Sequence, residues 1–305
     1  MAEFTIVSTG LSNGFGVITA DKIENERPDL HHILLCRNPK AIIKRKQVTV
    51  ITCDLSSIKS VQKASQEIIK LVNLGKVPPL KYFVGNAAIQ YPTRTVKTVD
   101  GFESTFQTNV VSYYFMMKAL LPLYQQHSGS RVILTGSDVH FGDLKHTLGL
   151  VPPPYWSDNV DELLFPVGNG ADNDPESMSA GARAYSSSKL ALIYYVHKLA
   201  KLYPEVDFLV YNPRIVIATG LTRHAKPFVK VMATIMGPLL LLLPSVSIPS
   251  TAGKVFFDTI FSDEVFDKVN NVAYCDKGDI IRSSEDSYNE KREEILWSAL
   301  ELIKV

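Results

Sequence analysis

Apolar and polar residues follow two patterns along this chain. Short, mostly apolar runs have the composition of buried strands, and longer stretches with one apolar face have the periodicity of helices. The runs that predict strands are Phe4–Ser8, His32–Cys36, Val48–Thr52, Lys81–Val84, Arg131–Thr135 and Asp207–Tyr211, with a weaker one near Asn271–Cys275. The stretches that predict helices are Gly14–Asn25, Ile58–Leu74, Gly101–Gln126 and Ala182–Tyr203. This alternation predicts an α/β fold, a doubly wound parallel sheet covered by helices on both faces.

Two stretches interrupt the alternation. Residues 144–180 contain VPPPYW and the polar run NGADNDPES, which predict a loop-rich insertion between a strand and a helix. Residues 219–250 contain the apolar run Phe228–Pro249. Both follow the carboxyl ends of strands, where ligands bind in this fold, so we expect an insertion on the substrate side and an apolar lid. No repeat or long linker is visible, and residues 1–305 are predicted to form one domain.

Composition excludes several classes of protein. Hydrophobic residues make up 46% of the chain, enough for a full core rather than disorder. Lys and Arg (32) nearly balance Asp and Glu (31), so no general attraction for nucleic acid is expected. Cys36 and Cys53 each end an apolar run and are predicted to be buried thiols, and the three cysteines lack metal-ligand spacing, so no metal is expected.

Nothing at the amino terminus has the pattern of a secretory signal, because MAEFTIVSTG runs directly into a predicted strand. Pro238 and Pro244 interrupt the apolar run in 228–249, which argues against a spanning helix. The expected location is the cytoplasm, with peripheral contact to a membrane as the alternative. The apolar run is then a lid, a membrane contact or a buried interface.

The first predicted strand leads into a glycine-rich turn, T-G-x-x-x-G-x-G, and then into a helix. Glycines let the backbone approach a pyrophosphate, while the helix N-terminus offers free N–H groups and a favourable dipole. A turn that uses glycine for geometry alone is the alternative, but the strand before it and the helix after it favour nucleotide binding. The residues predicted to bind a dinucleotide here are Gly10, Ser12, Asn13, Gly14, Phe15 and Gly16.

Residues at the ends of the next two strands predict which nucleotide binds. A cation after the second strand accommodates the 2′-phosphate of NADP, whereas a carboxylate would bind the ribose of NAD. Arg37 occupies that position with Asn38 beside it, so NADP is the predicted cofactor. After the third strand, Asp54 and Leu55 are predicted at the adenine, and Asp54 has capping of the helix near Ile58 as a second role.

Candidate catalytic residues follow in order along the chain. Asn86-Ala87-Ala88 follows the fourth strand, Asn109 lies in a long helix, and Ser137 follows the fifth strand. Tyr185 and Lys189 are four residues apart, so they share one face of a helix. An ammonium beside a phenol favours the phenolate and is expected to lower its pKa towards neutrality, while the Ser137 hydroxyl can bond a substrate oxygen.

These motifs resemble the short-chain dehydrogenase/reductase family over about residues 4–220. The matching segments are TGLSNGFG, CDLSS, GNAA, FQTN with Asn109, LTGS with Ser137, and YSSSK. The resemblance implies a Rossmann fold and hydride transfer to or from a nicotinamide. It implies that Tyr185 is the general acid/base and that Lys189 lowers its pKa and holds the nicotinamide ribose. Ser137 would polarise the substrate oxygen, and Asn109 would support a water that relays protons to Lys189.

The segment NPRIVIATGLTR (212–223) is similar to the branch with protochlorophyllide reductases and retinol-dehydrogenase-like enzymes, which generally use NADP. By this resemblance Pro213, Ile217, Thr219 and Leu221 contact the cofactor. Arg214 replaces a usual glycine, and GNAA replaces the commoner NNAG. No cysteine lies between the catalytic serine and tyrosine, which argues against a photoenzyme. Fungal and animal 3-ketosteroid reductases are a second similar group.

The predicted function is interconversion of a carbonyl and an alcohol on an apolar small molecule, using NADP(H). A 3-ketosteroid-type reductase at a membrane surface and a non-catalytic NADP(H) sensor are the alternatives. A nucleotide-sugar epimerase is disfavoured because few residues follow Thr219. The resemblance implies a homodimer through the helices 101–126 and 182–203. Tyr155 and Trp156, in the insertion, are predicted either to wall the substrate cleft or to lie on the surface.

Overall fold

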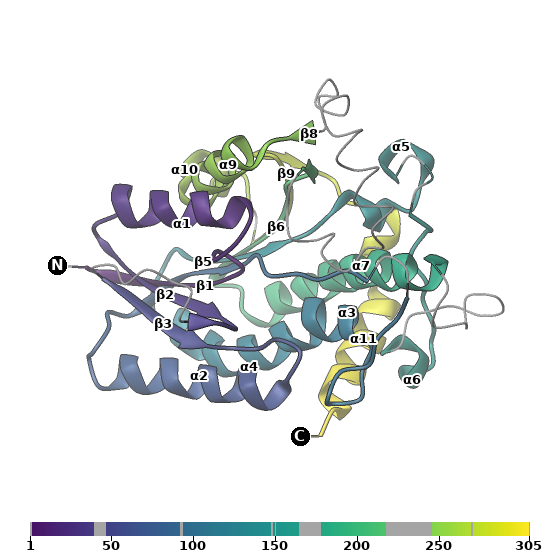
Figure 1. Cartoon of the computed structure of the whole chain (residues 1–305), viewed down its shortest axis with the longest axis horizontal. Coiled ribbons are helices and arrows are strands. Elements are labelled where there is room, and N and C mark those ends of the chain that lie inside the picture. Colours follow the sequence, from purple (N-terminus) through teal and green to yellow (C-terminus); the bar gives the residue numbers. More distant parts are fainter. Residues whose placement is uncertain are drawn as a thin grey trace.

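One sheet organises the chain in the computed structural model, which describes residues 2–39, 47–91, 94–147, 149, 151–164, 178–217, 246–269 and 271–304. Its strand order is β10-β9-β6-β5-β4-β1-β2-β3, and all neighbours are parallel except β9 and β10 (Figure 1). The strands are β1 (Phe4–Thr9), β2 (Leu30–Cys36), β3 (Val48–Thr52), β4 (Leu80–Gly85), β5 (Ser130–Thr135), β6 (Val206–Asn212), β9 (Val272–Asp276) and β10 (Asp279–Ile281). The predicted doubly wound parallel sheet is confirmed.

Helices cover both faces of this sheet (Figure 1). One layer packs on one apolar cluster and contains α1 (Phe15–Glu26), α9 (Pro249–Phe261) and α10 (Asp263–Phe266). The opposite layer packs on a second cluster and contains α2 (Ile58–Asn73), α4 (Ser112–Tyr124), α7 (Met178–Leu202) and α11 (Glu290–Leu302). Each helix buries one apolar stripe against the sheet, which accounts for the amphipathic periodicity of the sequence.

Some elements differ from the sequence prediction. The helix expected over 101–126 consists of α3 (Ser104–Phe106), a π-helical turn η2 (Gln107–Val111) and α4. The short helices α5 (Leu144–Thr147) and α6 (Val160–Leu163) lie in the predicted insertion. The helices α9 and α11 and the edge strand β10 were not predicted. That residues 1–305 form one domain stays a prediction.

The order of the strands reverses at β1, which lies between β2 and β4. Crossovers leave in opposite directions on the two sides of this point, so the loops after β1 and β4 diverge at the carboxyl edge of the sheet. The glycine-rich turn follows β1 and the GNAA segment follows β4. The fold therefore places the two most conspicuous sequence motifs at the carboxyl edge of the sheet, next to this reversal.

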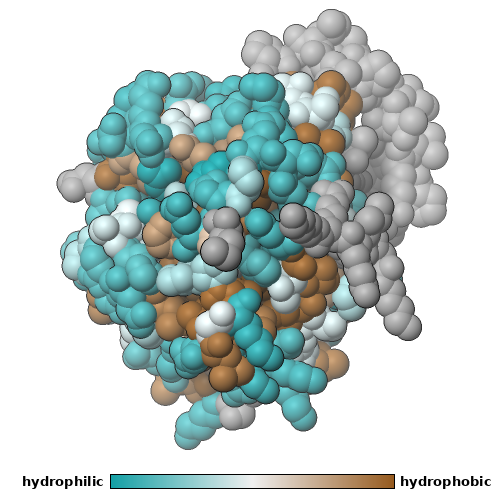
Figure 2. Space-filling model, turned by 90° about the vertical axis from the view of Figure 1, so that its left-hand side faces the viewer, coloured by the Kyte–Doolittle hydropathy of each residue, from teal (hydrophilic) through white to brown (hydrophobic). Residues whose placement is uncertain are grey.

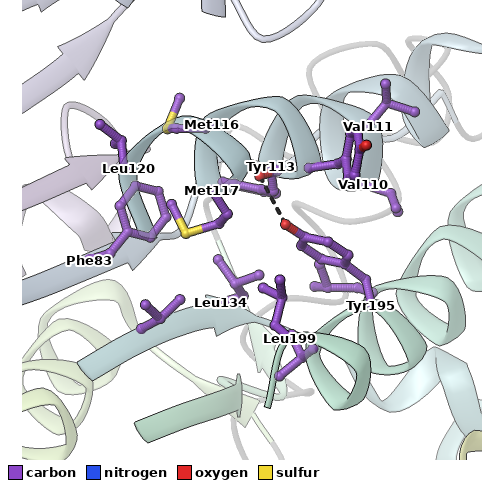
Figure 3. Close-up of a cluster of buried hydrophobic side chains, with 14 of the residues drawn as sticks. Phe83, Val110, Val111, Tyr113, Met116, Met117, Leu120, Leu134, Tyr195 and Leu199 are labelled. Atoms are coloured by element: carbon purple, nitrogen blue, oxygen red, sulfur yellow. Dashed lines mark hydrogen bonds between the residues drawn. The ribbon is translucent and has the colours of Figure 1, made fainter. Parts of the chain in front are cut away.

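The larger apolar cluster fixes α4 and α7 against the sheet (Figure 3). Phe83 of β4 and Leu134 of β5 face Met117 and neighbouring side chains of α4, and all are fully buried. Tyr195 Oη of α7 donates a hydrogen bond to the carbonyl oxygen of Tyr113 at 3.3 Å. Because close-packed side chains leave little room for displacement, this contact sets the position of α7, the helix that carries Tyr185 and Lys189.

The carboxyl-terminal helix α11 lies along α7. Trp297 stacks on Tyr195 with ring centroids 6.3 Å apart, and Lys201 forms an ion pair with Glu293 at 2.9 Å. Most side chains of α7 are buried within the single chain as a result. The homodimer expectation relied partly on an outer face of this helix, and α11 occupies that face. The homodimer stays a prediction.

The surface in Figure 2 is mostly hydrophilic, with hydrophobic residues in separate patches. Within the described parts of the chain, no helix is long and apolar enough to cross a membrane. Most of the predicted lid, including residues 218–245, lies outside the described residues. Its flanks are paired, because β7 (Ile215–Val216) lies parallel to β8 (Val246–Ser247). Cytoplasmic location stays a prediction.

Candidate active site

A cavity of about 850 Å³ lies at the carboxyl edge of the sheet, at the predicted switch point. Its wall contains most of the predicted site residues: Gly10, Ser12, Asn13, Gly14, Phe15, Arg37, Asn38, Asp54, Leu55, Asn86, Ala87, Ala88, Ser137, Tyr185, Lys189 and Pro213. Three other predicted residues, Gly16, Asn109 and Ile217, are described but do not line this cavity. Thr219 and Leu221 lie outside the described residues.

The glycine-rich turn packs directly on the segment that follows β4. Gly10 has φ +72°, and a Cβ there would lie 2.3 Å from the amide nitrogen of Ala87. A Cβ at Gly16 would lie 2.4 Å from the carbonyl oxygen of Gly10. Both contacts are with backbone, which cannot move away, so only glycine suits either position. Gly16 therefore acts behind the turn, holding its shape, while Gly10 and Gly14 face the cavity.

Hydrogen bonds join the ends of three strands to the helix α7. Asn86 Nδ2 donates to the carbonyl oxygen of Gly10 at 2.9 Å, and its Oδ1 accepts from Thr135 Oγ1 at 3.0 Å. Lys189 Nζ donates to the carbonyl oxygen of Thr135 at 2.7 Å. The nucleotide turn and the lysine are thereby held in one network. Displacement of either end would be transmitted to the other.

The departure from NNAG has a steric cause. A Cβ at Gly85 would lie 2.4 Å from a methyl group of Leu134 and 2.8 Å from the ring of Tyr113. The Tyr113 hydroxyl lies 3.0 Å from Thr9 Oγ1 and donates to the carbonyl oxygen of Ala87 at 2.7 Å. The glycine thus makes room for a tyrosine that ties the end of β1 to the loop after β4. Both strand ends border the cavity.

Ser137, Tyr185 and Lys189 meet at one part of this wall. Tyr185 and Lys189 project from the same face of α7, and Lys189 Nζ lies 5.7 Å from the centroid of the tyrosine ring. Ser137 follows β5 in an extended conformation. Tyr185 and Lys189 are both buried, at 6% and 2% exposure. The structure thus brings these three residues onto one cavity wall, and their assignment as catalytic residues stays a prediction.

Burial changes the ionisation of this pair in a way that the sequence did not predict. Desolvation raises the pKa of the Tyr185 phenol to about 12, although its hydrogen bond with Ser137 opposes the rise. Desolvation also lowers the pKa of Lys189 to about 7, so the amine is only partly charged at neutral pH. The expected lowering of the phenol pKa by the ammonium is therefore not found here. A phenol that keeps its proton at pH 7 suits proton donation to a carbonyl.

Asn109 is fully buried in the π-helical turn η2, a feature that often occurs at functional sites. Its Oδ1 accepts from the amide of Ile89 at 3.0 Å, and its Nδ2 donates to the carbonyl oxygen of Ile89 at 3.1 Å. Nδ2 also lies 3.0 Å from Ser188 Oγ. The side chain thus holds the cavity-lining segment at Ile89 in place. Support of a relay water by this side chain stays a prediction.

Replacement of Asn109 by alanine tests whether this side chain holds the Ile89 segment in place. We expect the free energy of unfolding to fall by about 2–3 kcal/mol, because the Ile89 backbone groups lose their partner inside the protein. Chemical denaturation followed by circular dichroism measures this. Ser65→Ala is a matched control, since its hydroxyl donates only to the helix carbonyl of Val61 and is equally buried. An unchanged midpoint for Asn109→Ala would contradict the structural role.

The residues after β2 and β3 border another part of the cavity. Arg37 and Asn38 are exposed, and both line the cavity. Asp54 Oδ1 accepts from the amide and hydroxyl of Ser56, at 3.0 and 2.7 Å. The residue that caps α2 is Ser57, whose side chain accepts from the amide of Ser60. The capping role considered for Asp54 is therefore wrong.

The aromatic residues proposed as cleft walls lie elsewhere. Trp156 packs edge-on against Tyr194 of α7, with centroids 4.9 Å apart, and Tyr155 Oη donates to Glu162 at 2.9 Å. Neither lines the cavity. This part of the insertion covers α7, and among the described residues of the insertion Val151 lines the cavity. Both aromatic residues are half-buried, and their placement as cleft walls is not supported by the described residues.

A second group of wall residues was not predicted from the sequence. They lie after the GNAA motif, in and before η2, and after Ser137: Ile89, Gln90, Tyr91, Ser104, Thr108 and Val139. Their position directly behind recognised motifs was the available signal. Arg214 also lines the cavity, with φ +54°, and its Nε lies 2.8 Å from both carboxylate oxygens of Asp276. This ion pair holds an arginine in a backbone conformation that normally favours glycine.

Comparison with known proteins places these features in a family. The family model described as short chain dehydrogenase matches residues 5–147. Protochlorophyllide reductase from Daucus carota is 27% identical over 248 residues, which cover 75% of this chain and 60% of that protein. The WW domain-containing oxidoreductase of Homo sapiens is 31% identical over 205 residues, covering 64% of this chain and 44% of that protein. The matches thus span less than two thirds of these relatives.

Solved structures share the fold. A short chain dehydrogenase/reductase from Saccharomyces cerevisiae superposes with a TM-score of 0.62 at 17% identity, over 90% of this chain and 96% of that chain. RhlG from Pseudomonas aeruginosa, solved as an active-site complex with NADP, gives 0.60 at 20% identity over 91% and 96%. At these identities the likeness concerns the fold alone. Taken with the ordered motifs and the sheet that carries them, these matches show that residues 5–147 are similar to the short-chain dehydrogenase/reductase family.

Proposed function

We propose that this chain is an NADP(H)-dependent oxidoreductase that interconverts a carbonyl and an alcohol. The observation that carries the proposal is the convergence of Ser137, Tyr185 and Lys189 on the wall of the same cavity as the glycine-rich turn. Two of these groups are buried and have strongly shifted pKa values, which is typical of catalytic sites. A non-catalytic NADP(H) sensor has no need for such a pair.

In the proposed reaction Tyr185 donates its proton to the carbonyl oxygen as that oxygen gains negative charge. When bound, the nicotinamide supplies the hydride that the carbonyl carbon takes, or accepts it in reverse. The Ser137 hydroxyl donates a hydrogen bond to the same oxygen and orients the substrate. Lys189 lies close enough to stabilise the phenolate that remains. The same groups act in reverse on an alcohol, so the ratio of cofactor forms sets the direction.

The cavity wall fits a phosphorylated dinucleotide. Glycines at positions 10 and 14 present backbone at the start of α1, where N–H groups and the helix dipole favour a diphosphate. Arg37 supplies an exposed cation where the 2′-phosphate of NADP belongs, with Asn38 as a neutral donor beside it. A relative in fold, RhlG of Pseudomonas aeruginosa, was solved with NADP. These features support NADP over NAD.

The proposed substrate is a small molecule with an apolar body. Ile89, Val139 and Val151 offer apolar surface on the cavity wall, and Ser104 and Thr108 add hydroxyl groups. This mixture suits a carbonyl compound with a polar substituent as well as hydrocarbon surface. A 3-ketosteroid-type reductase at a membrane surface stays the alternative within this class, and its discriminating property would be activity that depends on lipid vesicles.

A substrate screen tests the proposal. Purified protein is mixed with NADPH and a panel of aliphatic, aromatic and steroid ketones and aldehydes, and absorbance at the reduced nicotinamide band is followed. We expect several carbonyl compounds to be reduced, and the matching alcohols to be oxidised with NADP⁺. Ser137→Ala serves as the matched control and should lose this activity. Tight NADPH binding with no turnover of any compound would favour the sensor instead.

A further inference from the structure

His140 is a buried histidine for which the proposed mechanism has no role. It lies in the turn η3 (Asp138–Phe141), three residues after Ser137, and only 1% of its surface is exposed. Its Nδ1 lies 2.7 Å from the carbonyl oxygen of Ser137. Its Nε2 accepts a hydrogen bond from the backbone amide of Ser284, at 3.1 Å, from the carboxyl-terminal part of the chain. One side chain thus connects two segments 144 residues apart.

These two partners determine the protonation of the imidazole. A backbone carbonyl can only accept a hydrogen bond, so Nδ1 must carry a proton. A backbone N–H can only donate, so Nε2 must present its lone pair. The neutral Nδ1–H tautomer is the one form that satisfies both contacts. Burial agrees with a neutral ring, since it lowers the pKa of His140 to about 4.

Both sides of the Ser137 residue are held in place. Before it, the amide of Gly136 donates to the carbonyl oxygen of Tyr211 in β6 at 2.7 Å. After it, the Ser137 carbonyl has His140 as its partner. The histidine ring itself is fixed, because the rings of Phe141 and Tyr274 lie 4.1 and 4.9 Å away, centroid to centroid. A fixed peptide on each side fixes the direction in which the Ser137 side chain leaves the backbone.

The Ser284 amide, which donates to His140 Nε2, also has a fixed position. Ser284 precedes the turn η6 (Glu285–Tyr288), and its carbonyl oxygen accepts from the hydroxyl of Ser287 at 2.6 Å. Ser283, Ser284 and Ser287 are all buried. The carboxyl-terminal segment therefore offers a rigid amide to Nε2 rather than a mobile one. Through His140 this segment reaches the carbonyl of a residue on the cavity wall.

We propose that His140 is a positioning residue, which uses the Ser284 amide to hold the Ser137 peptide so that the serine hydroxyl faces Tyr185 and the substrate oxygen. This inference rests on the proposed function for the role of Ser137. His140 does not line the cavity and acts only through Ser137. Loss of the His140 side chain should therefore reduce turnover and leave the binding of NADPH unchanged, because the glycine-rich turn follows β1 and not β5.

A double-mutant cycle tests this coupling. His140→Phe keeps an aromatic ring between Phe141 and Tyr274 but removes both hydrogen bonds. We expect kcat to fall about 10-fold or more, with the Kd for NADPH within about twofold of the parent, because positioning is lost and the nucleotide site is not. In a Ser137→Ala background the same change should alter kcat by no more than about twofold, since residues that act as one unit are not additive.

The outcomes separate this inference from the proposed function. If Ser137→Ala alone leaves kcat unchanged, the proposed function fails. If Ser137→Ala lowers kcat but His140→Phe lowers it equally in both backgrounds, His140 acts elsewhere and the positioning role is overturned. His140→Gln separates the two contacts of His140. Its side-chain oxygen can still accept from the Ser284 amide, while the contact with the Ser137 carbonyl is lost, so its kcat should resemble that of His140→Phe.

Nitrogen-15 spectra of histidine-labelled protein give a readout independent of activity. The predicted signature of His140 is the Nδ1–H tautomer, unchanged between pH 8 and about pH 5 because its pKa is about 4. The titratable groups that face it are Asp143 and His146 from the following turn and Tyr274 from β9. Assignment uses the signal lost in His140→Phe. An Nε2–H tautomer would overturn the proposed contacts.

Discussion

Replacement of Tyr185 by phenylalanine is expected to lower kcat by about 10²–10⁴-fold, the usual contribution of a positioned general acid. The variant removes one oxygen atom and keeps the ring that lies 5.7 Å from Lys189 Nζ. NADPH should bind as before, because the nucleotide turn and Arg37 are untouched. Initial rates with the best carbonyl substrate measure kcat, and quenching of protein fluorescence by NADPH measures the Kd.

Tyr194→Phe is the matched control for this variant. Tyr194 lies on the same helix, and its hydroxyl donates to the carbonyl oxygen of Asp286 rather than facing the cavity. We expect its kcat to stay within about twofold of the parent, with a loss of about 1 kcal/mol in the free energy of unfolding. Full activity in Tyr185→Phe would remove the phenol from the mechanism. Equal losses in the two variants would point to helix damage instead.

Replacement of Arg37 by aspartate is expected to reverse the cofactor preference. A hydrogen bond between charged groups contributes about 1.5–3 kcal/mol, so kcat/KM for NADPH should fall about 10–150-fold, and further through repulsion between carboxylate and phosphate. The same carboxylate can accept from the 2′-hydroxyl of NADH, which should raise kcat/KM for that cofactor about fivefold. The ratio of the two values, measured with one substrate, is the test.

Arg37→Lys isolates the charge from the geometry of the guanidinium. A lysine keeps the positive charge but not the two parallel N–H donors, so a preference for NADPH should persist at a reduced ratio. Arg27→Asp is a remote control, because Arg27 pairs with Asp29 at the opposite end of β2. A ratio that is the same in Arg37→Asp and in the parent would show that the 2′-phosphate is bound by other residues.

Much of the fold was predictable because parallel strands leave a strong local signal. The seven parallel strands of the large sheet begin and end within two residues of their predicted limits, because most of them are apolar runs that are largely buried. The helices α9 and α11 were not predicted because no recognised motif follows them and their apolar residues are less regularly spaced. In α11 the charged residues that pair with Lys198 and Lys201 interrupt the apolar face.

The residues of the candidate site were predictable where they belong to ordered local motifs. Ser137 follows the end of a predicted strand, and Tyr185 and Lys189 share a helix face through their spacing, so the three could be grouped. Contacts between distant segments left no comparable signal: the Asn109 amide is occupied by Ile89, and Trp156 packs on α7 rather than on the cavity. The raised pKa of Tyr185 was missed for a related reason, because burial by the whole fold outweighs its nearest neighbour.

The proposed mechanism requires that one cavity brings a nicotinamide ring to Ser137, Tyr185 and Lys189. A crystal structure of the chain with bound NADP⁺ tests it most directly. We expect the diphosphate at Gly10 and Gly14, the 2′-phosphate at Arg37, and the nicotinamide ring within contact distance of the Tyr185 hydroxyl. A dinucleotide bound outside this cavity, or bound in it with the nicotinamide remote from Tyr185, would contradict the account.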